Sequence, residues 1–181
     1  MPVTGHKFFI TGFPRMRSAW FANWFTTGPI RCLHDGTMGL ESLAQYYNRL
    51  QHVPAPIVGD ANSAIPFFWD QLAERYNNPP IVLIVRPVDE VMAFGKKIGR
   101  IDWILPLKEA IEDLSLHYPV KVVPYYEIED RLQEIWEYCV GQHTYDEDRT
   151  EMLSKLNVQA DISRYADKRI IGAAQHFMRS I

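Results

Sequence analysis

The sequence has few cysteines, no long apolar run and no large excess of either charge. Its two cysteines, Cys32 and Cys139, form no CxxC pair, so we expect free thiols in a reducing compartment and not a disulfide or metal cluster. No apolar run approaches the roughly 20 residues of a membrane span. Gly5-His6-Lys7 leads straight into a strand pattern, unlike a signal peptide. We therefore expect a cytoplasmic protein with no membrane partner.

The net charge also limits the classes of function that the protein can have. The formal net charge is −3, which argues against a protein that coats nucleic acid, although it leaves room for a local basic pocket. The hydrophobic, aromatic and charged fractions of 47%, 13% and 23% are those of an ordinary globular protein. At 181 residues the chain is long enough for one sizeable core. We expect a single domain over residues 1–181.

Short apolar segments alternate with segments of helical periodicity. The clearest strand, Ile81–Val85, is apolar on both faces, as buried parallel strands are. The alternation predicts an α/β fold, a three-layer sandwich with a central parallel sheet of about five strands. The predicted strands are 7–11, 30–33, 56–59, 81–85 and 120–123. The first predicted helix begins at residue 18. The others lie at 40–50, 64–76, 91–92, 106–117, 128–139 and 170–178. Residues 140–163 are polar and partly irregular in this prediction, with a solvated charge run at 146–149.

A basic turn follows the first strand, in the segment Thr11–Ser18. A turn from strand into helix points backbone N–H groups at one place, and the helix dipole favours an anion there. Arg15 and Arg17 add forked cationic donors, and Ser18 adds a hydroxyl. The simpler alternative is a helix capped by Ser18 with two solvated arginines beside it. The position of both arginines in this turn favours a phosphate-binding site.

The turn lacks the Walker A pattern. GxxxxGK[ST] would require Gly at position 17 and Lys at position 18, where the chain has Arg17 and Ser18. A kinase or NTPase would therefore lack its phosphate-binding lysine here.

Residues 12–20 resemble the 5′-phosphosulfate loop of the sulfotransferases, aromatic-Pro-Lys/Arg-Ser-Gly-Thr-Thr-Trp. Phe13, Pro14, Arg15, Ser18 and Trp20 fit the pattern, whereas Met16, Arg17 and Ala19 depart from it. The Arg at 17, together with Cys32-Leu33-His34-Asp35 after the second strand, resembles small phage- and bacterial-type sulfotransferase-like proteins; a phage-encoded chain would act in the host cytoplasm. The resemblance implies a P-loop-like fold in which the strands 8–11 and 81–85 are adjacent. The nucleotide-binding residues that it implies are Pro14, Arg15, Met16, Arg17, Ser18, Ala19, Trp20 and Arg86.

Arg86 begins the second resembling segment. It follows the strand 81–85, and the resemblance implies that it binds near the 3′-phosphate of the nucleotide. The family has Ser eight residues later, where this chain has Phe94. A guanidinium at the end of a central strand usually has an anion or a carboxylate partner, and Glu127 or Asp60 is the structural alternative that we consider.

Three residues are candidates for the chemistry: His34, Asp60 and Arg15. In parallel sheets ligands lie beyond the carboxyl ends of the strands, where all three are expected. Imidazoles titrate near neutral pH, which suits a general base. Asp35 would orient His34, although adjacent residues often point apart. The alternatives are a surface histidine in a turn and an Asp60 that caps the helix begun by Asn62.

The resemblance implies a sulfotransferase that moves a sulfuryl group from 3′-phosphoadenosine 5′-phosphosulfate (PAPS) to a hydroxyl or amine acceptor. Its partners would be this nucleotide and a small acceptor, with no nucleic acid, no membrane and no metal, and a homodimer stays open. One alternative is a degenerate P-loop nucleotide- or anion-binding protein without catalysis. A nucleotide or metabolite kinase is the other, and magnesium-dependent ATP binding would support it.

Overall fold

A five-stranded parallel sheet forms the centre of the computed structural model, which describes residues 5–97, 99, 101–141 and 143–156. Its order is β2-β3-β1-β4-β5, and every neighbouring pair is parallel. The strands are β1 (His6–Gly12), β2 (Ile30–His34), β3 (Ile57–Ala61), β4 (Ile81–Val85) and β5 (Lys121–Pro124). The predicted α/β fold, and the adjacency of β1 and β4 at its centre, are therefore confirmed.

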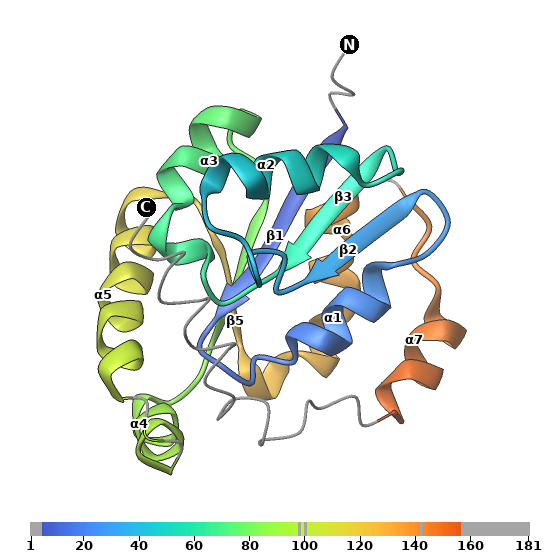
Figure 1. The fold of residues 1–181 in the computed structure, drawn as a ribbon. Helices are drawn as coiled ribbons and strands as arrows, with labels where there is room; N and C mark the ends of the chain where they lie inside the picture. The colour runs from blue at the N-terminus through green and yellow to red at the C-terminus, as the bar shows by residue number, and fades with distance from the viewer. Residues whose placement is uncertain (1–4, 98, 100, 142, 157–181) are drawn as a thin grey trace.

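Helices cover both faces of this sheet (Figure 1). Those described are α1 (Ser18–Phe25), α2 (Leu43–His52), α3 (Trp69–Tyr76), α4 (Val88–Lys97), α5 (Ile101–His117), α6 (Leu132–Val140) and α7 (Glu147–Ser154). Short 3₁₀ turns occupy Ile65–Phe67, Tyr125–Glu127 and Glu129–Arg131. Local chemistry sets some boundaries: the Ser42 side chain accepts from the Gln45 N–H and so begins α2.

Several helix predictions differ from the structure. The helix predicted at 128–139 is divided into the 3₁₀ turn Glu129–Arg131 and α6, because Arg131 leaves the helical conformation. The helix predicted at 64–76 is divided into a 3₁₀ turn and α3, because Phe68 between them leaves the helical conformation. The helix predicted to begin near Pro106 begins at Ile101, so the proline lies inside α5. Proline fits best in the first turn of a helix, which explains why the sequence misplaced this start. The helix predicted at 170–178 lies outside the described residues.

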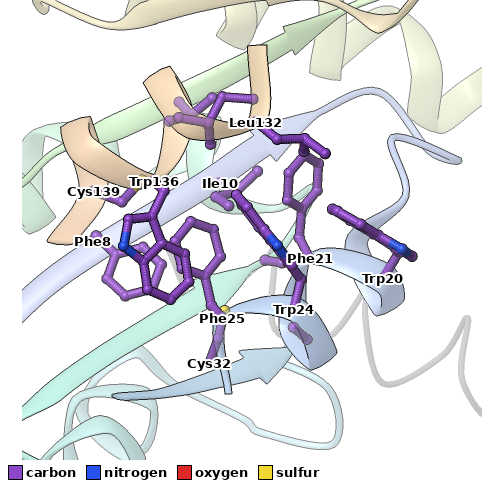
Figure 2. Packing of buried hydrophobic residues seen from close by; sticks show 14 of the residues in the cluster. Phe8, Ile10, Trp20, Phe21, Trp24, Phe25, Cys32, Leu132, Trp136 and Cys139 are labelled. Carbon is purple, nitrogen blue, oxygen red and sulfur yellow. The ribbon is translucent and has the colours of Figure 1, made fainter. Parts of the chain in front are cut away.

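The core is divided by the sheet. On the α1 and α6 side, aromatic side chains pack closely (Figure 2): the Phe25 and Trp136 rings are stacked with centroids 5.3 Å apart. On the other face, Tyr46, Phe68 and Leu72 of the α2–α3 region pack together with Leu114 of α5. Both cysteines are buried free thiols. These layers hold the carboxyl ends of the strands, and the loops that follow them, in fixed positions.

The last described helix, α7, attaches to α1. The Asp146 side chain accepts from the Arg149 N–H and begins α7. The Arg149 guanidinium donates to the carbonyls of Asn23, Trp24 and Thr26 at the end of α1. The prediction of a solvated charge run at 146–149 is therefore wrong for Arg149. Free carbonyls at a helix end accept from cations.

Candidate functional site

The turn between β1 and α1 has an unusual backbone. Arg15 and Arg17 both have φ of 67°, in the left-handed region, which costs free energy for a residue with a Cβ atom. Arg17 is also the N-cap residue of α1, and its carbonyl accepts a hydrogen bond from the Phe21 N–H. It thus adopts the conformation that a glycine would adopt easily. Strained backbone of this kind gathers at functional sites, where the surrounding structure holds it.

The side chains of this turn point to different neighbours. The Arg15 guanidinium lies over the Phe94 ring, 5.4 Å from its centroid. Arg17 pairs with Glu129 at 3.1 Å and lies 5.1 Å from the Trp20 ring centroid. The side chains of Met16 and Trp20 are buried in the core. Any contact of Met16 with a ligand would therefore come from its backbone.

Arg86, directly after β4, lies against the same turn. Its Nη1 donates to the Arg15 carbonyl at 3.2 Å, and its Nη2 donates to Glu90 Oε2 at 2.9 Å. The Tyr125 ring faces the guanidinium, 3.9 Å from centroid to Cζ. The structural alternative, in which Glu127 or Asp60 pairs with Arg86, is wrong, because Glu90 takes that place. The physical reason is that Glu90 follows Arg86 by four residues, a spacing that brings side chains together in helical backbone.

A pocket of about 380 Å³ opens where these elements meet. It gathers three cations and one carboxylate, and its aromatic walls are Phe94 and Tyr125. The residues that line it are Pro14, Arg15, Arg86, Glu90, Val91, Ala93, Phe94, Lys97 and Tyr125. The sequence predicted Pro14, Arg15 and Arg86, and it placed Tyr125 at the end of the last strand, but it missed Glu90 and Lys97. The four-residue spacing of Arg86 and Glu90 was a signal that could have identified Glu90.

His34 ends β2 on the other side of the turn and does not line this pocket. Its Nε2 lies 3.2 Å from Ser18 Oγ and 3.2 Å from Asp35 Oδ2. The structure therefore brings His34 together with the start of α1 and with the adjacent carboxylate. Burial raises the pKa of Asp35 to about 6. A histidine held between a carboxylate and a hydroxyl can accept or release a proton at this edge of the sheet.

Asp60 is enclosed within the fold and fully buried. Its carboxylate accepts from the Tyr46 hydroxyl at 2.8 Å, the Asn62 amide at 3.1 Å and the Gly36 N–H at 3.0 Å. Burial raises the pKa of Asp60 to about 7, although these hydrogen bonds act against the shift. The alternative role as a helix cap is wrong, because Asn62 accepts from the Ala64 N–H instead. Its position makes Asp60 a support of the loop after β2.

Over the described residues, no three or more His, Cys, Asp or Glu side chains gather closely enough to hold a metal ion. No helix in the described part of the chain is long and apolar enough to span a bilayer.

The five-stranded parallel sheet and the helices on both of its faces form an α/β fold that is similar to the fold of a sulfotransferase. A solved structure with this fold is mouse sulfotransferase SULT7A1 complexed with PAP, which superimposes with a TM-score of 0.52 over 95% of this chain and 79% of that chain. The two sequences are 11% identical, so the likeness establishes the fold alone. No protein-family model and no curated protein sequence matches the chain.

Proposed function

We propose that this chain binds a nucleoside 5′-phosphosulfate, of which PAPS is the member that the resemblance implies, and transfers its sulfuryl group to a hydroxyl or amine acceptor. One observation carries the proposal: Arg15, in the left-handed turn between β1 and α1, lies beside Arg86 at a pocket that gathers three cations. The neighbour bound to PAP has the same fold. Kinase chemistry has no comparable support, because Lys is absent from the turn.

In the proposed reaction the acceptor oxygen or nitrogen attacks sulfur. The bond between sulfur and the oxygen of the 5′-phosphate breaks, and that oxygen keeps the electron pair. Arg15, Arg17 and the first N–H groups of α1 stabilise the negative charge on the leaving phosphate. The acceptor proton passes to His34, which Asp35 orients through the 3.2 Å contact with Nε2. Fixed positions and fixed charges supply most of the catalysis in such transfers.

A binding protein without catalysis is the second candidate. It is favoured by the pairs that Arg17 and Arg86 already form with Glu129 and Glu90. Such pairs lower the number of cations ready to receive a phosphate. In this alternative the nucleotide would bind, but the sulfated donor would not be consumed in the presence of any acceptor.

Calorimetry on the full chain tests the proposed site. We expect adenosine 3′,5′-bisphosphate and the sulfated donor to bind, and ATP with magnesium or sulfate alone to bind more weakly. Arg15→Ala should cost on the order of 2–5 kcal/mol of nucleotide binding, the usual loss for a buried charge contact. Arg31→Ala is the matched control, since Arg31 is exposed and bonds only carbonyls near its own strand in the described structure. Unchanged binding by Arg15→Ala would place the nucleotide elsewhere.

A further inference from the structure

The carboxylate in the pocket is the feature that the proposed function leaves unexplained. Glu90 is the single acidic side chain among the lining residues, beside Arg15, Arg86 and Lys97. A pocket that binds only phosphate has no need of an acid, because like charges repel an incoming anion. Contacts with Arg86 and Tyr126 also fix the place of Glu90 on the first turn of α4.

Both oxygens of Glu90 are engaged. Oε2 accepts from Arg86 Nη2 at 2.9 Å, and Oε1 accepts from the Tyr126 hydroxyl at 2.6 Å. The hydrogen bonds from Tyr126 and Arg86 lower the pKa of Glu90 below its ordinary value. Glu90 therefore remains ionised at neutral pH and contributes a negative charge to the pocket wall.

The Arg86 guanidinium also has several partners within the protein. It donates to Glu90 and to the Arg15 carbonyl, and the Tyr125 ring covers one face of its guanidinium. Its Nε is buried and has no hydrogen-bond partner within the described residues. A phosphate that used this guanidinium would lie next to the Glu90 carboxylate. The buried Nε can still donate to a further acceptor, but the negative charge of Glu90 favours a neutral acceptor there.

The sugar of a nucleotide can offer either group at its 3′ position. A hydroxyl is neutral, donates to a carboxylate and accepts from a guanidinium, so an Arg86–Glu90 pair satisfies both of its roles. A 3′-phosphate would instead add about two negative charges beside Glu90. In dinucleotide-binding folds an acidic residue receives a ribose hydroxyl, whereas an arginine accommodates a ribose phosphate. Phe94, which lines the same pocket, supplies no hydroxyl that could donate to a phosphate.

We propose that Glu90 makes this site select a nucleoside 5′-phosphosulfate whose ribose has a free 3′-hydroxyl over one that carries a 3′-phosphate. The inference rests on the proposed function, and it specifies the class of donor. Three cations and one carboxylate leave two positive charges on the pocket wall, which suits a phosphosulfate alone better than a phosphosulfate with a second phosphate.

The experiment compares two unreactive leaving groups, 5′-AMP and adenosine 3′,5′-bisphosphate, by calorimetry at a fixed ionic strength of about 0.15 M. The wild-type chain should bind 5′-AMP at least as tightly as the bisphosphate. Glu90→Gln keeps the shape of the side chain and removes its charge. It should shift the ratio of the two affinities roughly tenfold towards the bisphosphate. Asp89→Asn is the matched control, because Asp89 is the exposed neighbour on α4 and does not line the pocket.

The outcomes separate this inference from the proposed function. A wild-type chain that binds the bisphosphate more tightly than 5′-AMP overturns the inference and leaves the proposed function standing. An affinity ratio that Glu90→Gln leaves unchanged, or that Asp89→Asn shifts equally, also overturns it. If neither nucleotide binds, the proposed function is wrong and the inference fails with it. Circular dichroism of each variant establishes that it is folded.

Discussion

Arg17 occupies a left-handed backbone position that glycine would occupy without strain. Its side chain is held by Glu129 and by the Trp20 ring. Exposed contacts of this kind contribute little, so the geometry of the turn is maintained by the surrounding fold. The turn thus places a cation at a backbone position that favours glycine.

Comparison of Arg17→Gly with Arg17→Ala isolates the backbone strain, because both variants lose the same side-chain contacts. Arg17→Gly should be more stable than Arg17→Ala by about 1 kcal/mol, since only glycine relieves the strain. Urea unfolding followed by tryptophan fluorescence measures the difference. At Arg75, exposed in α3, alanine should instead be the more stable by roughly 1 kcal/mol. Equal stabilities at position 17 would contradict the strained turn.

His34 is the residue that we expect to take the acceptor proton. His34→Ala should leave nucleotide binding within about twofold of wild type and lower turnover by roughly 10²–10⁴-fold, the usual range for a general base. Release of the nucleotide product, with donor hydrolysis as the fallback reaction, measures turnover. A purely structural His34 would give a lower unfolding free energy with normal turnover per folded molecule, and that result would exclude the base role.

At this scale the sequence predicted some contacts and missed others. The strand ends located His34 and Arg86, because hydrophobic runs define where strands stop. The sequence suggested that Asp35 orients His34, and the structure places the two side chains 3.2 Å apart, with a left-handed backbone at Asp35 whose φ is 50°. The partner of Arg86 also depended on how α4 leaves the strand, which no hydrophobic pattern encodes.

At the scale of elements, the contact between α7 and α1 is the least expected. Trp20 donates through its indole N–H to the Leu153 carbonyl, and Trp24 donates to the Thr150 hydroxyl. Together with Arg149, these bonds fix α1, the helix that begins at the phosphate turn. The sequence could not predict this contact, because α7 is short and polar and its bonds join side chains to residues more than 120 positions away.

Removal of the Arg149 guanidinium should weaken this attachment. Arg149→Ala leaves the end carbonyls of α1 without their cationic donor, so we expect a loss of about 1–2 kcal/mol in the free energy of unfolding. Arg149→Lys keeps the charge but loses the forked geometry, so its free energy of unfolding should lie between those of the wild type and Arg149→Ala. Asp148→Ala, an exposed change on the same helix, is the control. Urea unfolding checks the series, and equal loss by Asp148→Ala would contradict a specific role for Arg149.

At the scale of the whole molecule, the parallel sheet and the adjacency of β1 and β4 were predicted, whereas the buried polar network was not. Apolar runs such as β4 mark central strands, and strand–helix alternation leaves few arrangements for them. Asp60 shows the limit of that reasoning. Only the three-dimensional structure shows that its carboxylate lies among Tyr46, Asn62 and the loop after β2. This buried acid affects the stability of the entire fold.

The free energy of unfolding should fall as pH rises from about 4 to about 7. Burial raises the pKa of Asp60 from 3.8 to about 7 in the folded state, so over this range the folded chain holds a proton that the unfolded chain has lost, and folding loses stability as pH rises. Asp35, whose pKa burial raises to about 6, acts in the same direction. Asp60→Asn should flatten this dependence in part, because Asp35 continues to titrate. Urea unfolding at several pH values measures the slope, with Asp70→Asn, an exposed change in α3, as a control that should parallel the wild type. Parallel slopes for Asp60→Asn and the wild type would show that Asp60 does not carry a raised pKa.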